Sequence, residues 1–339
     1  MNTDVSTHVS YDVDGIDPVT FEVRQACMVI ILVIVSGFVS LFGMGANIIN
    51  IVVFVRQGFR DSVNISLCGL AIADLASVTT TFWSSILYNP EVSNADLPFN
   101  AMDVLYLTGG YAHACFNRVT SFVTAFVTLE RCLCITFPLH IKTIFTPTRT
   151  KIIIINIFLV IIVIFSPFYY VNRLEWTFDE ARNKTILSLV YTDNRIVVET
   201  FTFLIHSVAM SAISLSSVIV CTGILIIKLN QKTKWRQGNA VQSNSKPETA
   251  SLKDKKVVKM VAFISTIFII CFTPATAIFL TMACYPEFSF GGRYQNMFYT
   301  VWAFATLLEI INSSVNIFIY LSMSSKFKIT FIDIFCCKK

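Results

Sequence analysis

Seven long apolar segments dominate this sequence, and they limit the possible folds more than any other feature. A helix that crosses ~30 Å of hydrocarbon needs ~20 mostly apolar residues. Segments of this kind cover residues 27–55, 63–88, 103–136, 151–171, 197–229, 252–283 and 295–321. Each is expected to be helical, because backbone groups inside a bilayer must form hydrogen bonds within their own segment. The sequence therefore predicts an all-α membrane protein, a seven-transmembrane helix bundle spanning residues 27–321.

The composition argues against a soluble fold and against several functions. Hydrophobic residues make up 55% of the chain and charged residues 14%, whereas an average globular protein has about 25% charged residues. The Lys and Arg residues lie in short stretches between apolar segments rather than on a basic face, so no nucleic-acid partner is expected. The four histidines are dispersed at His8, His113, His140 and His206, and this spacing does not indicate an enzyme.

Positive charge separates the two sides of the predicted bundle. Lys and Arg gather after the first, third, fifth and seventh apolar segments, whereas Asp and Glu prevail on the other side. Since cytoplasmic loops carry the excess of Lys and Arg, the tail 1–26 is expected outside the cell and residues 322–339 inside. The plasma membrane is the expected location. Segment 230–251, rich in Gln, Asn, Ser and Lys, is expected to be a flexible third cytoplasmic loop.

Two further features lie outside the apolar segments. Ser325–Phe335 alternates Lys with Phe and Ile, which is typical of a short amphipathic helix on a membrane surface. Cys336 and Cys337 follow directly and are candidate palmitoylation sites, the alternative being two exposed free thiols. Asn183 begins an Asn-Lys-Thr glycosylation sequon in a predicted outer segment.

Polar residues are costly inside a membrane, and here they recur within the apolar segments as short motifs. These motifs are LAIAD ending at Asp74, ERC beginning with Glu130 and Arg131, FIICFTP ending at Pro274, and NSSVNIFIY from Asn312 to Tyr320. Together and in this order they resemble the rhodopsin-like (class A) G-protein-coupled receptors over about residues 27–337. The resemblance implies a receptor that binds an extracellular ligand and activates a heterotrimeric G protein.

The resemblance also implies a switch near the inner side of the bundle. Arg131 would be held by Glu130 and, at rest, by Asp254, although Asp254 could instead only neutralise a basic loop. Pro274 should kink the sixth helix, and nearby aromatic rings would change rotamer as that helix moves, the alternative being an ordinary aromatic core. The residues implied for switching and G-protein contact are Glu130, Arg131, Leu139, Asp254, Phe268, Phe272, Pro274, Asn316 and Tyr320.

A second implied site lies in the middle of the bundle. Its members are Asn47, Asp74, Thr120, Asn312, Ser313 and Asn316. A carboxylate with several hydroxyl and amide oxygens suits a hard cation, so Asp74 is a candidate ligand of a structural sodium ion. A water-filled polar network without sodium is the alternative. No other cofactor is expected.

The ligand pocket is expected nearer the outer side, around His113, Asn117, Arg118 and Glu309. An unpaired Arg at this depth is expensive, so an Arg118–Glu309 ion pair is predicted. The pair either joins two helices or gives way to a carboxylate or peptide group of the ligand. By resemblance, His113 replaces the Asp that binds primary amines, and the seventh segment lacks the Lys that binds retinal. A peptide or a small chemosensory molecule is therefore the expected ligand.

The chain also departs from the family pattern. Tyr106 replaces the family's disulfide cysteine, and residues 170–196 contain no Cys, so this outer segment is expected to be more mobile. Cys27 and Cys284 could form a different disulfide. Such losses resemble divergent molluscan chemosensory receptors, with neuropeptide receptors as the other type considered. A transporter or channel is the remaining alternative, but it predicts internal repeats or a continuous polar pore, and neither is evident.

Overall fold

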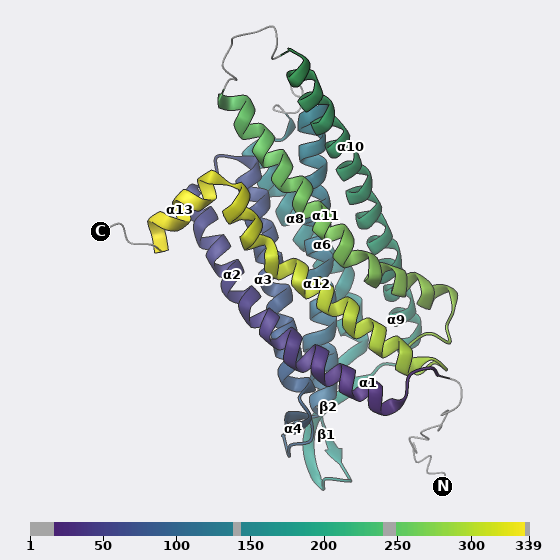
Figure 1. Cartoon of the computed structure of the whole chain (residues 1–339). Coiled ribbons are helices and arrows are strands. Elements are labelled where there is room, and N and C mark those ends of the chain that lie inside the picture. The colour runs from purple at the N-terminus through teal and green to yellow at the C-terminus, as the bar shows by residue number, and fades with distance from the viewer. Residues whose placement is uncertain (1–16, 138–143, 240–248, 336–339) are drawn as a thin grey trace.

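The computed structural model describes residues 17–137, 144–239 and 249–335, with only the backbone described for 232–239 and 249–255. Seven long helical spans run side by side through the molecule, which confirms the predicted bundle (Figure 1). The spans are Phe21–Gln57 (α1, η1 and α2), Ser62–Tyr88 (α3), Ala101–Thr136 (α5, η2 and α6), Pro147–Val171 (α8), Arg195–Asn239 (α9, η3 and α10), Thr249–Cys284 (α11) and Gln295–Met323 (α12). Ser325–Phe335 forms the short helix α13, and Pro90–Ser93 forms the single turn α4.

Three spans contain a short π-helical stretch, in which the backbone hydrogen bonds reach one residue further than in an α-helix. These stretches are η1 (Val29–Val35), η2 (Leu105–Gly110) and η3 (Leu204–Ala209). Around them lie α1 (Phe21–Met28) and α2 (Ser36–Gln57), α5 (Ala101–Val104) and α6 (Tyr111–Thr136), and α9 (Arg195–Phe203) and α10 (Met210–Asn239). No feature of the apolar pattern predicted these local changes of pitch.

Several predicted boundaries differ from the observed ones. The first helix begins at Phe21 rather than residue 27, because Thr20 caps it by accepting a hydrogen bond from the Val23 amide. Helix α10 continues to Asn239 and α11 begins at Thr249, so much of the segment expected to be a loop is helical. Lys, Gln and Arg are good helix formers, which explains the extension. Residues 240–248 lie outside the described part.

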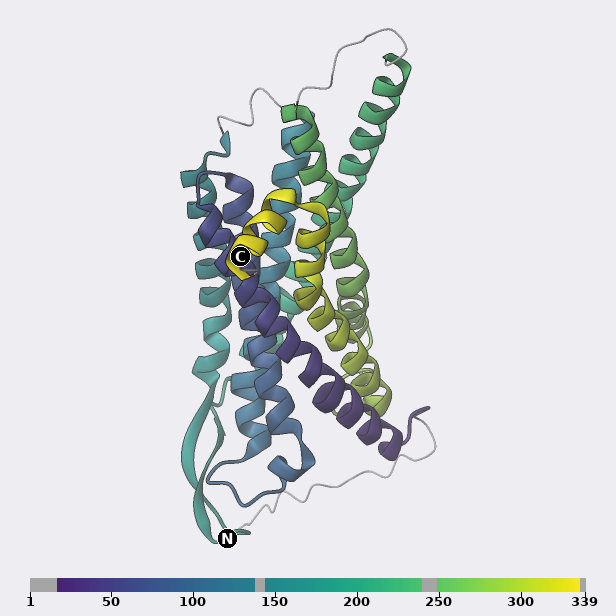
Figure 2. The ribbon, with the colours of Figure 1, turned by 60° about the vertical axis from the view of Figure 1, so that its left-hand side comes forward.

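Helix α6 occupies the centre of the bundle. It contacts α3, α8, α10 and α11, and it contributes polar residues to each of the three layers described below. Helix α8 lies at the periphery of the bundle (Figure 2). The side chains of Ile152, Ile155, Leu159 and Val163 on this helix are exposed. Broad exposed apolar faces of this kind on a helical bundle are suited to contact with lipid.

One end of the bundle carries a two-stranded antiparallel sheet and is called the hairpin end here. Strand β1 (Asn172–Asp179) pairs with β2 (Lys184–Tyr191). The Leu187 amide donates to the Pro98 carbonyl, and the Leu187 carbonyl accepts from the Asn100 amide, both at 2.9 Å. Asp103 Oδ2 accepts a hydrogen bond from the Leu189 amide at 3.0 Å. The segment expected to be a mobile loop is thus a hairpin tied to the start of α5.

A charged contact and two cysteines also lie at this end. Lys184 donates to Asp96 and lowers the pKa of that carboxyl through a hydrogen bond and its positive charge. Cys27 and Cys284 are both free thiols, so the suggested disulfide is wrong. Cys27 packs against a buried cluster that includes Met28 and Ala303, whereas Cys284 is exposed where α11 ends.

The opposite end, the α13 end, is closed by aromatic packing. Phe327 of α13 is buried, with its ring centroid 5.3 Å from those of both Phe54 and Tyr320. The Ser324 hydroxyl accepts from the Phe327 amide and so begins the helix. The remaining residues of α13 are largely exposed, as expected for a helix at a membrane surface. The candidate palmitoylation sites, Cys336 and Cys337, lie outside the described residues.

The Asp103 contact makes the attachment of the hairpin testable. An Asp103→Ala variant should lose a hydrogen bond to a charged acceptor, which contributes about 1.5 kcal/mol and therefore limits local opening roughly tenfold. Hydrogen–deuterium exchange of β2 in nanodiscs should accelerate by about this factor. The exposed Glu175 of β1 provides the control, since Glu175→Ala removes a charge but no contact between hairpin and bundle. Equal exchange in both variants would contradict the proposed attachment.

Candidate functional site

Polar side chains cross the bundle interior in three layers, which we name by their position. The hairpin-side layer contains His113, Asn117, Arg118 and Glu309, the middle layer surrounds Asp74, and the α13-side layer contains Glu130 and Arg131. Asp74 and Glu130 have no exposed surface, and Asn117 and Arg118 retain 2% and 5%. Hydrocarbon offers no hydrogen bonds, so these side chains depend on hydrogen-bond partners within the protein. Those partners determine which groups of each layer remain available to a ligand or an ion.

The hairpin-side layer links α3, α6 and α12 through His113. Its Nδ1 lies 2.9 Å from Thr81 Oγ1 and 3.2 Å from Ser77 Oγ. Asn117 Nδ2 donates to Glu309 Oε2 at 2.6 Å and lies 3.2 Å from His113 Nε2. His113 Nε2 is 3.8 Å from the same carboxylate oxygen. A neutral ring with its proton on Nδ1 satisfies both nitrogens.

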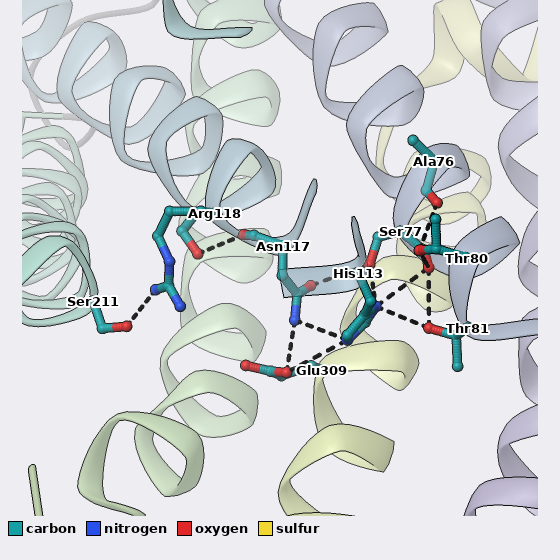
Figure 3. Close-up of polar contacts among 10 residues, drawn as sticks. Ala76, Ser77, Thr80, Thr81, His113, Asn117, Arg118, Ser211 and Glu309 are labelled. Atoms are coloured by element: carbon teal, nitrogen blue, oxygen red, sulfur yellow. Dashed lines mark hydrogen bonds and ion pairs between the residues drawn. The ribbon is translucent and has the colours of Figure 1, made fainter. Parts of the chain in front are cut away.

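The predicted Arg118–Glu309 ion pair is wrong. Figure 3 shows Arg118 directed away from Glu309 and toward α10, where its Nη1 donates to the Ser211 hydroxyl. Neighbouring residues in a helix with 3.6 residues per turn are ~100° apart around its axis. Helix α6 therefore presents Asn117 to α12 and Arg118 to α10, and Glu309 accepts its hydrogen bond from Asn117 instead.

The middle layer joins the same three helices around Asp74. Thr120 Oγ1 donates to Asp74 Oδ1 at 3.0 Å, and Asn316 Nδ2 donates to Asp74 Oδ2 at 2.9 Å. Asn47 Nδ2 donates to the Ser313 carbonyl at 2.8 Å and thereby ties α2 to α12. Asn312 is buried on the same helix. Of the residues expected from the sequence to share this site, Thr120 and Asn316 contact Asp74 and Asn47 contacts Ser313, whereas Asn312 is only known to be buried.

The middle layer has the oxygen donors that a sodium ion requires. Asp74 is fully buried, and within the described residues its oxygens accept only from neutral groups. The Ser313 hydroxyl lies near the same carboxylate but is buried without a well-formed hydrogen bond. A hard cation would bind this carboxylate with the hydroxyl oxygens of Ser313 and Thr120. Asp74, Thr120 and Ser313 are therefore the residues that would hold such an ion.

The α13-side layer is an ion pair between neighbouring residues. Arg131 Nη2 donates to Glu130 Oε1 at 2.7 Å and to Ser62 Oγ at 3.3 Å. Ser66 Oγ donates to Glu130 Oε2 at 3.3 Å, which orients the buried carboxylate. Arg131 therefore contacts α3 through the hydroxyl of Ser62. Leu139 lies outside the described residues, and only the backbone of Asp254 is described, so the lock between Asp254 and Arg131 stays a prediction.

The aromatic residues predicted to switch pack between these layers. Phe268 and Phe272 stack on α11 with ring centroids 4.2 Å apart, and Pro274 lies in the same helix just beyond them. Tyr320 is buried against Phe54, and its hydroxyl has no hydrogen-bond partner among the described residues. A buried hydroxyl without a partner costs free energy. A rearrangement of α12 that supplied one would therefore be favoured.

The structure adds polar residues that the motifs did not indicate. They are Ser62, Ser66, Ser77, Thr81, His206 and Ser211. Ser77 and Thr81 follow Asp74 by three and seven residues, a spacing that places them on the same helix face and could have identified them. His206 and Ser211 follow no such pattern, since the π-helical stretch η3 changes the pitch there.

Comparison with known proteins identifies the family that this chain matches. Residues 34–338 match the serpentine type seven-transmembrane G-protein-coupled chemoreceptor family Srw. A probable G-protein coupled receptor of Caenorhabditis elegans is 24% identical over 88% of this chain and 67% of its own length. The FMRFamide peptide receptor frpr-18 of the same species is 22% identical over 92% and 70%. The tachykinin-like peptides receptor 86C of Drosophila melanogaster is 25% identical over 88% and 57%.

These relatives agree with a divergent rhodopsin-like receptor and do not favour a transporter or channel. The family match covers most of the chain and includes all three polar layers. The chain belongs to the Srw family of serpentine seven-transmembrane chemoreceptors, G-protein-coupled receptors of the plasma membrane that bind an extracellular ligand and are not a class of enzymes.

Proposed function

We propose that the hairpin end faces outward, that ligand binding there rearranges the bundle, and that the α13 end then activates a heterotrimeric G protein. The excess of Lys and Arg in the segments at the α13 end supports this orientation. Asn183, the sequon residue, is exposed at the tip of the hairpin with a positive φ of 48°. We propose glycosylation at this tip and palmitoylation of Cys336 and Cys337 at the opposite end.

The Glu130–Arg131 pair is the observation that carries the coupling proposal. Glu130 is completely buried, and Arg131 is drawn toward it and toward Ser62 of α3. A partly buried pair adds little net stability, but removing one partner leaves an uncompensated charge. In the resting receptor the Arg131 guanidinium is therefore bound within the bundle and is not available to a partner. Once released by a bundle rearrangement, it would reach the G protein together with Leu139.

The middle layer connects this pair to the ligand side. Asp74 binds α6 through Thr120 and α12 through Asn316. A relative shift of these helices must break or exchange one of the two hydrogen bonds. Phe268 and Phe272 pack on the neighbouring face of α11, where Pro274 removes one helix hydrogen bond and permits bending. Ligand binding would act through these contacts.

The relatives favour two ligand types without choosing between them. The Srw description is that of chemoreceptors, whereas two of the relatives above are named for FMRFamide and tachykinin-like peptides. The hairpin-side layer offers His113, Asn117 and Glu309 to hydrogen-bond a ligand. We propose a peptide or a small chemosensory molecule as the ligand. A screen of both classes in cells reporting calcium and cAMP tests this, with Arg131→Ala cells showing the background.

Releasing Arg131 should raise ligand-independent activity. Glu130→Gln keeps the size of the side chain but removes the charge that holds Arg131. If the pair restrains Arg131 by about 1.4 kcal/mol, the rate of nucleotide exchange without ligand should rise roughly tenfold. This rate is measured as GTPγS binding by purified heterotrimers of each Gα class, with the receptor in nanodiscs.

The double variant Glu130→Gln, Arg131→Ala should return exchange to the level without receptor. Arg293→Ala is the matched control, since Arg293 is exposed at the hairpin end far from this pair. Wild-type exchange in the Glu130→Gln variant with every Gα class would show that this pair does not restrain Arg131.

Sodium should stabilise the receptor through Asp74. In sodium chloride the unfolding temperature should exceed that in N-methylglucamine chloride by roughly 2–4 °C, because a bound ion stabilises only the folded state. Asp74→Asn should abolish the difference, while Asp333→Asn on the exposed face of α13 should preserve it. A water network without sodium predicts equal temperatures in the two salts, and that result would reject the ion.

A further inference from the structure

Arg118 is a buried cation without a carboxylate partner. Only 5% of its surface is exposed, and its one hydrogen bond in the described part of the chain runs from Nη1 to the neutral hydroxyl of Ser211. Its Nε is buried and has no hydrogen-bond partner among the described side chains. Among the side chains that the structure describes, in residues 17–137, 144–231 and 256–335, no Asp or Glu oxygen lies within 4.0 Å of this guanidinium. The charge is therefore left largely uncompensated.

The charged and titratable groups that face Arg118 do not supply the missing partner. Glu309 attracts it from α12, but that carboxylate accepts the Asn117 amide at 2.6 Å and lies near His113. His206 of η3 interacts with Arg118 as a potential second cation rather than a counter-ion. Leaving a charge in this condition within a membrane protein is unfavourable. An anion bound beside the guanidinium would remove this cost.

On the basis of the proposed receptor function, we infer that Arg118 binds a carboxylate of the extracellular ligand between α6 and α10. A guanidinium presents a planar fork of N–H groups that matches a carboxylate with two parallel hydrogen bonds. The Nε of Arg118 has no hydrogen-bond partner among the described residues and is therefore available to a ligand. If a carboxylate displaces the Ser211 hydroxyl from Nη1, that hydroxyl can in turn donate a hydrogen bond to the carboxylate. One positive charge also balances one carboxylate without excess.

The position of this contact explains how such a ligand would act on the receptor. Leu215 lies four residues beyond Ser211, one helical turn along α10, and packs in the same cluster as Phe268 and Phe272. Ala125 of α6 completes that cluster. A carboxylate that draws α6 and α10 together at Arg118 would press directly on the aromatic stack of α11. Ligand binding and the bending of α11 are thereby linked through a single layer of side chains.

The first test measures the receptor without any added carboxylate. If Arg118 is uncompensated, Arg118→Gln should raise the unfolding temperature in nanodiscs by roughly 2–4 °C, since it removes a buried charge and keeps a polar end for Ser211. A structural role would move the temperature in the opposite direction. The exposed Arg293 is the control, and Arg293→Gln should leave the temperature unchanged. A lower temperature for Arg118→Gln than for the wild type would overturn the proposal.

The second test supplies carboxylates of known structure. Sodium acetate, butyrate, benzoate and phenylacetate are each compared with the corresponding amide at constant sodium and ionic strength. The acids should raise the unfolding temperature of the wild type and the amides should not. Arg118→Gln should lose the response, and Arg118→Lys, which keeps the charge without the fork, should retain only part of it.

Three outcomes would refute the assignment. They are the absence of any response to the four acids, an undiminished response in Arg118→Gln, and an equal response to chloride in methanesulfonate buffer, which would indicate a resident halide. The test does not depend on G-protein coupling. A receptor that responds to carboxylates through Arg118 but shows no nucleotide exchange in the Glu130→Gln variant would refute the coupling proposal alone.

Discussion

Hydrocarbon supplies no hydrogen bonds, and this one constraint governs the arrangement of the bundle. Each polar side chain within the spans either finds a partner on another helix or remains at a cost. Asp74 satisfies the constraint with two partners on two helices, and Glu130 satisfies it with Arg131 and Ser66. Arg118 does not, and it is the position where a molecule from outside gains most by binding. The need of buried polar side chains for partners thus accounts both for the contacts that stabilise the bundle and for the proposed ligand site.

Helix α6 connects the three layers because its residues face different neighbours at each level. Asn117 turns to α12 and Arg118 to α10, Thr120 reaches Asp74 of α3, and Glu130 accepts from Ser66 of α3. A small rotation or translation of this one helix would alter all of these contacts together. Packed interiors respond by exchanging discrete arrangements rather than by gradual deformation. The geometry is well suited to two states, and one helix couples them.

Sequence patterns predicted what depends on apolar length and on the depth of polar residues. The seven spans, α13 and the gathering of Asp74, Thr120 and Asn316 belong to this group. The direction of Arg118 was missed because depth alone does not state which neighbour a side chain faces, and a step of one residue along α6 turns it by ~100°. The hairpin was missed because its pairing with residues 98–100 joins segments far apart in sequence. Helical ends were misplaced where charged residues with high helix propensity continued a span.

The hairpin end has no covalent tie in the described part of the chain, and this has a consequence for how the receptor admits its ligand. Strand β2 is held by backbone hydrogen bonds to Pro98 and Asn100 and by the carboxylate of Asp103. Such bonds exchange readily with water, whereas a disulfide opens only with a reductant. Separation of the described hairpin from Pro98, Asn100 and Asp103 would therefore require no change of redox state. The attachment of β2 to the bundle should accordingly be equally strong in oxidising and in reducing surroundings.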